Sequence, residues 1–156
     1  MDENGSGSMG SDMSAWEPLI GAWDSSGQTV ERPGEPSVSI EGSDVYEWLP
    51  GERFVVHHVD VRMGGAQVNV LEVIGERDGD GHLMRSFDHT GGTALMRATR
   101  DDAGVWTFAG STERARLEVA EDGASMAATW ERHVDGGWEH WMDMRFRRRP
   151  DSQRSS

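Results

Sequence analysis

The chain has 156 residues, a hydrophobic share of 35% and a formal net charge of −13. This acidity argues against a general basic surface for nucleic acid phosphates or anionic lipid, so we expect neither a nucleic acid nor a membrane as partner. The sequence contains no Cys, and all 15 of its cationic side chains are Arg, which excludes thiolate chemistry, disulfides, Cys-ligated metal sites and Schiff-base catalysis by Lys.

The start of the chain is rich in Gly, Ser and Asp, a composition typical of a disordered tail. Ser14 and Glu17 then have the spacing of a capping box, which predicts a short helical turn from Trp16 to Ile20. The polar end of the chain predicts a second tail. The expected organisation is a tail, one domain and another tail: residues 1–14, 15–147 and 148–156.

Ten strand-like runs with alternating apolar residues follow the helical turn, separated by Gly, Asp and Pro turn signals. Short sequential hairpins predict an all-β fold, an up-and-down antiparallel barrel of about ten strands plugged by the N-terminal helical turn. A filled sandwich or half-barrel without a cavity is the alternative. The runs cover residues 22–31, 38–49, 54–63, 67–75, 82–88, 93–99, 105–110, 113–119, 125–133 and 138–147.

The hairpin around Gly64-Gly65 has the clearest register. A two-residue turn there fits the primed turn types, which need the positive φ that glycine adopts without steric cost. The turn places His57 opposite Glu72, on a face whose other pairs are aliphatic. We therefore expect this face to be buried, with one His–Glu pair inside it. The aliphatic pairs are Val61–Val68, Val59–Val70 and Val55–Ile74.

The closing hairpin is interpreted in the same way. A three-residue loop at residues 135–137 pairs apolar residues that should face the interior, and it places His140 on the same face, opposite Arg132 near the barrel mouth. The expected apolar pairs are Trp130–Met142, Ala128–Met144 and Met126–Phe146.

The middle strands allow two registers. With Gly91-Gly92 as a two-residue loop, Phe87 pairs with Met96, Arg85 pairs with Ala98, and the inward residues include Arg85, Phe87 and His89. A slip by one residue brings Ser86 and Asp88 inward instead.

The His57–Glu72 pair is the candidate polar site. In one interpretation Glu72 sets the tautomer of His57, whose other nitrogen faces the cavity as acid, base or ligand contact. In the other, the pair is a satisfied buried pair that serves the fold. An inward Arg85 would bind an anionic oxygen of a ligand or neutralise Glu72. Further residues predicted to contact a ligand are Phe87, Met96, Trp130, His140, Met142 and Met144.

We expect no metal site. The adjacent His57 and His58 resemble a metal pair, but neighbouring residues on a strand point to opposite faces and cannot chelate one ion.

The segment from Trp16 to Trp23 (WEPLIGAW), with Gly21-Ala22-Trp23 as a Gly-x-Trp motif, resembles the opening of the lipocalin-like (calycin) barrels. The chain is similar to a bacterial lipocalin-like family of unknown function over about residues 16–147. The resemblance implies that Trp23 packs at the barrel floor under an Arg from the last strand, either Arg145 or Arg147. The other matching segments are residues 46–50, 56–60, 72–75, 85–88, 106–108, 130–132 and 141–145.

A more distant resemblance is to the nitrobindin-like haem-binding barrels, whose proximal His lies on the closing strand. That resemblance implies His140 as a haem ligand, although the Gly- and Pro-rich first-strand segment of that group is missing after Trp23.

These observations predict that the barrel binds a small, mostly apolar molecule in its interior, anchored by His57 and Glu72, without a cofactor. One alternative is an acid–base isomerase or cyclase that uses His57, and another is a haem protein that uses His140. No stretch has the apolar length of a membrane span, so we expect a cytoplasmic location. The ligand and the oligomeric state are left open.

Overall fold

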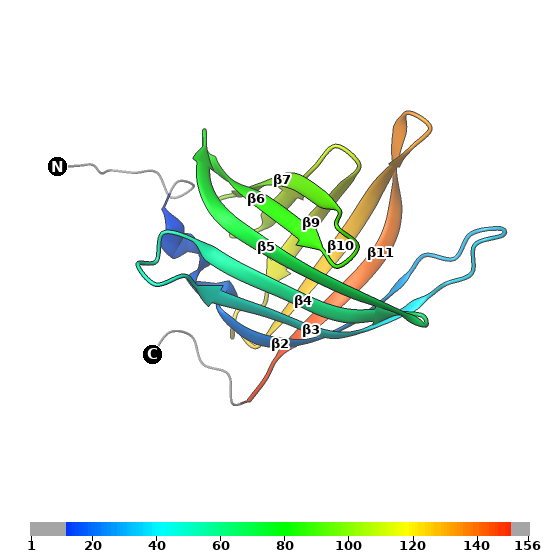
Figure 1. Cartoon of the computed structure of the whole chain (residues 1–156), viewed down its shortest axis with the longest axis horizontal. Helices are drawn as coiled ribbons and strands as arrows, with labels where there is room; N and C mark the ends of the chain where they lie inside the picture. The colour runs from blue at the N-terminus through cyan, green and yellow to red at the C-terminus, as the bar shows by residue number, and fades with distance from the viewer. Residues whose placement is uncertain (1–11, 151–156) are drawn as a thin grey trace.

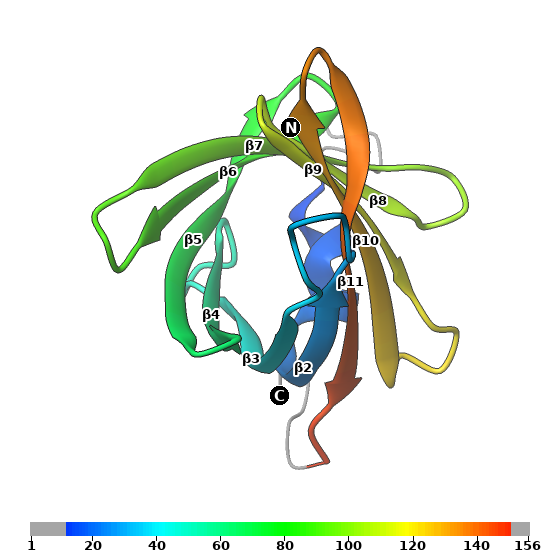
Figure 2. The ribbon, with the colours of Figure 1, turned by 90° about the vertical axis from the view of Figure 1, so that its right-hand side faces the viewer.

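The computed structural model describes residues 12–150 and contains ten antiparallel strands that close into one barrel (Figures 1 and 2). Each strand pairs with its sequence neighbours, and β2 pairs with β11 to close the ring. The predicted all-β, up-and-down barrel is therefore confirmed. The strands are β2 (Gly21–Thr29), β3 (Ser39–Trp48), β4 (Val55–Met63), β5 (Ala66–Asp78), β6 (Gly81–Asp88), β7 (Thr93–Arg100), β8 (Trp106–Ala109), β9 (Glu113–Val119), β10 (Ser125–Val134) and β11 (Gly137–Arg148).

A short helix, η2 (Met13–Leu19), closes one end of the barrel, which we call the floor (Figure 1). It is a 3₁₀-helix, and its N-cap is Asp12, whose side chain accepts a hydrogen bond from the Ser14 amide at 2.9 Å. The expected capping box at Ser14 is therefore wrong. Trp16 and Leu19 are fully buried, so the helix fills the floor as the predicted plug.

The floor residue Trp23 is covered by Arg148. The Arg148 guanidinium lies 4.2 Å from the Trp23 ring centroid and donates to the carbonyl oxygens of Ile20 and Pro18 at 2.6 and 2.8 Å. The prediction of Arg145 or Arg147 is wrong because these odd-numbered residues point to the outer face of β11. The expected tail boundaries at residues 14 and 148 are wrong too, since η2 begins at Met13 and β11 extends to Arg148. The remaining tail predictions, for residues 1–11 and 151–156, lie outside the described residues.

The register of the first hairpin is confirmed. Met63 pairs with Ala66 across the Gly64-Gly65 turn, where Gly64 has a φ of 62°, and His57 pairs with Glu72. Both side chains lie on the buried face of the barrel wall, which we call the inner face.

The closing hairpin differs from its predicted form near the turn. Asp135 and Gly136 form a two-residue turn with φ of 50° and 80°, and a bulge next to Trp130 then restores the expected pairing of Trp130 with Met142. Between the turn and the bulge, His140 lies opposite Glu131 instead of Arg132. The predicted inward orientation of His140 is therefore wrong.

The middle strands adopt the alternative register. A bulge at Gly75 places Ser86 opposite Glu72, so Ser86 is on the inner face and Arg85 and Phe87 are on the outer face. The loop that follows spans residues 89–92 and is longer than the predicted two-residue loop. The Asp88 side chain stabilises it by accepting hydrogen bonds from the amides of residues 90 and 92. The prediction that Arg85, Phe87 and the loop residue His89 point inward is wrong.

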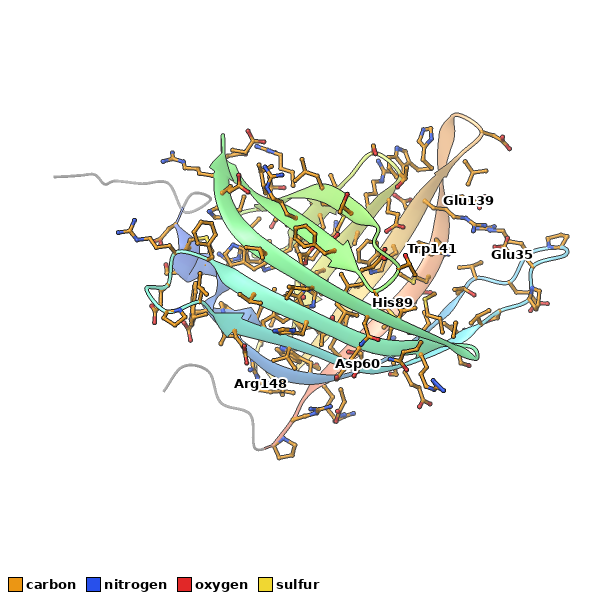
Figure 3. The ribbon with its side chains drawn as sticks, viewed as in Figure 1. Glu35, Asp60, His89, Glu139, Trp141 and Arg148 are labelled. Carbon is orange, nitrogen blue, oxygen red and sulfur yellow. The ribbon has the colours of Figure 1, made fainter. Side chains whose placement is uncertain are left out.

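The end of the barrel away from the floor is held by ion pairs. Arg132 on β10 donates to Glu139 at 2.8 Å and to both carboxylate oxygens of Glu35 at 3.0 and 2.9 Å. Figure 3 shows Glu35 and Glu139 at this end and Arg148 at the other. Some apolar side chains of the inner face are only partly buried: Val59, Met63, Val68, Met96, Trp130, Met142 and Phe146.

Candidate functional site

A row of buried polar side chains crosses four neighbouring strands on the inner face. His57 Nδ1 lies 2.9 Å from Glu72 Oε1, and His57 Nε2 lies 2.7 Å from Asp44 Oδ2. The Ser25 hydroxyl donates to the other Asp44 oxygen, Oδ1, at 2.5 Å. All four residues are at most 8% exposed. We call Ser25, Asp44, His57 and Glu72 the polar row.

Strand pairing explains why these side chains meet. Glu72 is the direct cross-strand partner of His57, and Asp44 lies two residues before Tyr46, the partner of His57 on β3. Residues two apart on a strand share a face, so Asp44 reaches the imidazole along the diagonal. Ser25 reaches Asp44 in the same way, since its own partner on β3 is two residues before Asp44.

Tyr46 packs on the polar row. Its ring stacks on the His57 ring with a centroid distance of 3.9 Å and an interplanar angle of 10°. Tyr46 is only 5% exposed, yet its hydroxyl makes no hydrogen bond to any residue of the described range 12–150. Burial, together with the charges of Asp44 and Glu72, raises the pKa of Tyr46 well above 10, so the phenol is neutral.

The contacts of His57 determine its charge. Ionised carboxylates only accept hydrogen bonds, so an imidazole between two of them donates from both nitrogens. Burial alone would lower the pKa of His57, but the hydrogen bonds to Asp44 and Glu72 and their negative charges outweigh burial and raise it to about 9. At neutral pH His57 is therefore an imidazolium, without a lone pair for proton abstraction.

The predicted contact between His57 and Glu72 is present, but the environment of His57 differs from the prediction. The second ring nitrogen does not face the cavity, because Asp44 accepts its hydrogen bond. Asp44, Ser25 and Tyr46 were not predicted for this site. The connection between β3 and β4 spans residues 49–54, which is too long for turn geometry to define a register, so the sequence carries little signal for Asp44.

Three other predicted contact residues lie outside the barrel. Arg85 bonds to Glu76, and both side chains are nearly half exposed. His140 bonds to Asp143 at 2.9 Å and is 45% exposed, so it is not placed to ligate a haem in the interior. Phe87 is also on the outer face and 48% exposed.

The remaining predicted contact residues lie on the inner face. Met144 is buried, while Met96, Trp130 and Met142 are partly buried against the core. They form an apolar wall on the inner face.

A pocket of about 720 Å³ lies beside the first half of β7, which has no paired strand on the β8 side. Strand β8 pairs with β7 only from Arg97 to Arg100, so residues 93–96 extend past it. The pocket is lined by Ser86, the strand partner of Glu72, and by Met96, both on the inner face, and by the half-buried Glu113. It adjoins the Glu72 end of the polar row through Ser86.

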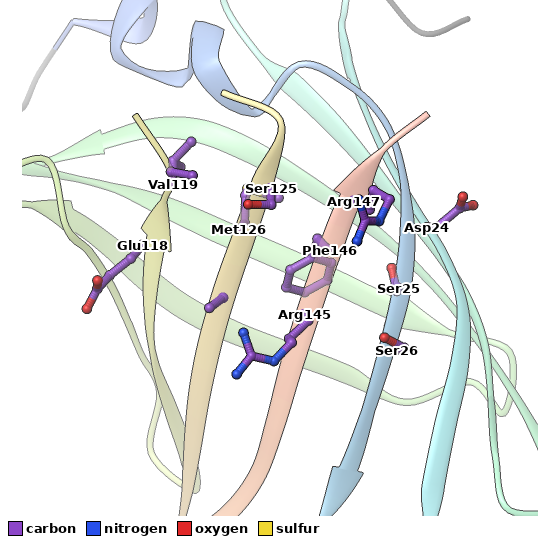
Figure 4. Close-up of a pocket in the computed structure, with 12 residues that line it drawn as sticks. Asp24, Ser25, Ser26, Glu118, Val119, Ser125, Met126, Arg145, Phe146 and Arg147 are labelled. Carbon is purple, nitrogen blue, oxygen red and sulfur yellow. The ribbon is translucent and has the colours of Figure 1, made fainter. Parts of the chain in front are cut away.

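A second pocket, of about 620 Å³, lies over β2, β10 and β11 and next to the end of β9 (Figure 4). Its outward side chains include Arg145, Arg147 and Glu118. Among the polar row only Ser25 contributes to its lining, and the Ser25 hydroxyl already bonds to Asp44. We therefore place the candidate site at the polar row and not in this groove.

Within the described residues, no group of three or more His, Asp or Glu is arranged to hold a metal ion. The part of the chain that the structure describes also contains no helix of the length and apolarity needed to cross a membrane.

Comparison with known proteins adds information about the fold. No protein-family model matches the chain, and no curated protein matches its sequence. A de novo designed fluorescence-activating β-barrel matches with a TM-score of 0.50 and 13% sequence identity, over 86% of this chain and 97% of the designed chain. At this identity the similarity shows a shared barrel fold.

Proposed function

We propose that this protein binds a small, mostly apolar molecule inside the barrel, with the polar row as the anchor for the polar group of the ligand. The observation that carries the proposal is the polar row itself. Its buried charged groups lie on the same inner face as partly exposed apolar side chains, the usual composition of a small-molecule site. The pocket beside β7, next to Ser86, is the proposed entrance.

Two further features are compatible with this function. The designed barrel of similar fold is described as fluorescence-activating, and a ten-strand barrel of this kind is wide enough to hold a small ligand. The cover of Trp23 by Arg148 also fits the lipocalin-like resemblance, which we propose as the relationship of this chain.

Acid–base catalysis by His57 is less favoured. A general base needs a free lone pair directed at the substrate, and both nitrogens of His57 point at carboxylate oxygens. We therefore propose binding and not isomerase or cyclase activity.

The test combines ligand detection with a variant that blocks the interior. Native mass spectrometry of the purified protein would detect a molecule that co-purifies, and titration with a neutral apolar fluorophore would measure binding directly. Val59 is partly buried on the inner face two residues from His57, so Val59→Phe should weaken fluorophore binding at least about tenfold by filling the space. His58→Phe, on the exposed outer face of the same strand, is the matched control. Equal binding by both variants, or no binding by the parent protein, would contradict the proposal.

A further inference from the structure

We propose that the ligand is a cation, a protonated amine on an apolar body, whose N–H groups donate to Glu72 Oε2 and to the Tyr46 hydroxyl oxygen. This inference rests on the proposed binding function and specifies the class of ligand.

The first observation is the charge of the polar row. Two carboxylates, Asp44 and Glu72, surround one imidazolium, so the formal charge of the row is −1. Removing such a charge from water is costly unless an opposite charge or hydrogen-bond donors compensate it. A cationic ligand would bring the sum to zero.

Two described arginines at the ends of the barrel have other contacts, whereas Arg100 on β7 lies over the Trp106 ring at 5.8 Å and has a buried Nε without a hydrogen-bonding partner in the described chain. Arg132 at the open end binds Glu35 and Glu139, and Arg148 donates to backbone carbonyls at the floor. Arg85, which the sequence placed beside Glu72, pairs with Glu76 on the outer face. The sequence contains no Lys. Within residues 12–150, no Arg forms an ion pair with either carboxylate of the polar row.

The second observation is a pair of polar atoms without protein partners. Glu72 bonds to His57 through Oε1, while its other oxygen, Oε2, makes no hydrogen bond to any described residue. The Tyr46 hydroxyl has no such bond within the described chain either, and neither oxygen is among its fully buried unpartnered atoms, so both keep contact with solvent that a ligand would replace. A carboxylate oxygen accepts only, and the neutral phenol oxygen can accept as well. Two acceptors beside a net negative charge match the several N–H donors of an ammonium group and repel a carboxylate.

The lining of the proposed entrance carries one carboxyl group and one paired arginine. Glu113 lines the pocket beside β7, and burial raises the pKa of its carboxyl group. Arg85, the basic residue in that lining, is bound by Glu76. The lining next to Ser86, the strand partner of Glu72, therefore offers a carboxyl group and apolar contacts from Met96.

The test compares three probes of nearly equal shape: 1-naphthalenemethylamine, 1-naphthalenemethanol and 1-naphthoic acid. We expect the amine to bind at least about tenfold more tightly than the alcohol at neutral pH, and the acid to bind most weakly, because a charged hydrogen bond is stronger than a neutral one. The preference should persist in about 0.5 M NaCl, which screens the acidic surface but not a buried contact.

Substitutions at Glu72 and Tyr46 test whether these residues cause the preference for the amine. Glu72→Gln should reduce the amine preference to within about threefold while alcohol binding remains, because the variant removes the negative charge that the ammonium contacts. Tyr46→Phe keeps the ring that stacks on His57 and loses the hydroxyl, so it should weaken the amine about fivefold if the protein with Gln at position 72 does not fold. Glu47→Gln, an exposed acid on β3, is the charge-matched control and should change nothing.

The outcomes separate the two proposals. Equal binding of amine and alcohol, or a preference that salt or Glu47→Gln removes, would overturn the inference and leave the binding function standing. Failure of all three probes to bind would overturn the binding function itself, and the inference with it.

Discussion

Protonation of His57 should make the stability of this protein depend on pH. The pKa of His57 rises from its usual value of 6.5 to about 9 in the folded protein, because the bonds and charges of Asp44 and Glu72 outweigh burial. A folded-state pKa above the unfolded value means that the native state binds the proton more tightly. This stabilisation is complete below about pH 6.5 and is lost as the pH rises through 9. A difference of about 2.5 pH units corresponds to roughly 3 kcal/mol of unfolding free energy.

Urea unfolding followed by Trp fluorescence, at several values from about pH 6 to pH 9.5, would measure this loss. The pH series ends below pH 10 because Tyr46, whose pKa is raised, adds a further loss of stability above about pH 10. The same series on His57→Gln measures how the other histidines change the unfolding free energy with pH, and this contribution is then subtracted. The parent protein should lose roughly 3 kcal/mol more than the variant over this range. If both lose the same amount, or if NMR titration shows His57 neutral at pH 7, the proposed imidazolium is absent.

Three further predictions concern single substitutions. Asp44→Asn should lower the pKa of His57, measured by NMR, and cost about 1–3 kcal/mol of stability, because one charged hydrogen bond is lost. An unchanged pKa would mean that Asp44 does not bond to the imidazolium. Arg148→Ala should lower the free energy of unfolding in urea by about 2–4 kcal/mol, because three backbone carbonyls lose their hydrogen-bond donor. Arg147→Ala, on the outer face, should change it by less than about 0.5 kcal/mol, and equal effects of the two substitutions would refute the role of Arg148. Gly42→Ala should lower the free energy of unfolding by about 1–3 kcal/mol, because the new Cβ meets the carbonyl oxygen of Asp60 and the Cα of Val61. Gly137→Ala has free space around its Cβ and should be nearly neutral, and a Gly42→Ala protein of unchanged stability would contradict the close strand contact.

The sequence alone determined the fold class and the local pairing of the first hairpin. Alternation of apolar residues identifies a strand and its buried face, and the two-residue turn at Gly64-Gly65 defines which residues oppose each other. For this reason the pairing of His57 with Glu72 could be predicted. The ten strands could be located for the same reason, because strand periodicity and turn residues are local properties.

The tertiary structure alone decided which side chains complete the site. Bulges at Gly75 and beside Trp130 each shift the pairing by one residue, and a one-residue shift moves every following side chain to the opposite face. This shift places Arg85 outside and Ser86 inside. Asp44 meets His57 because β3 pairs with β4 across a connection whose length leaves the register open. The net charge of the polar row, on which the proposed ligand selectivity depends, therefore follows from contacts between strands and not from any motif in the chain.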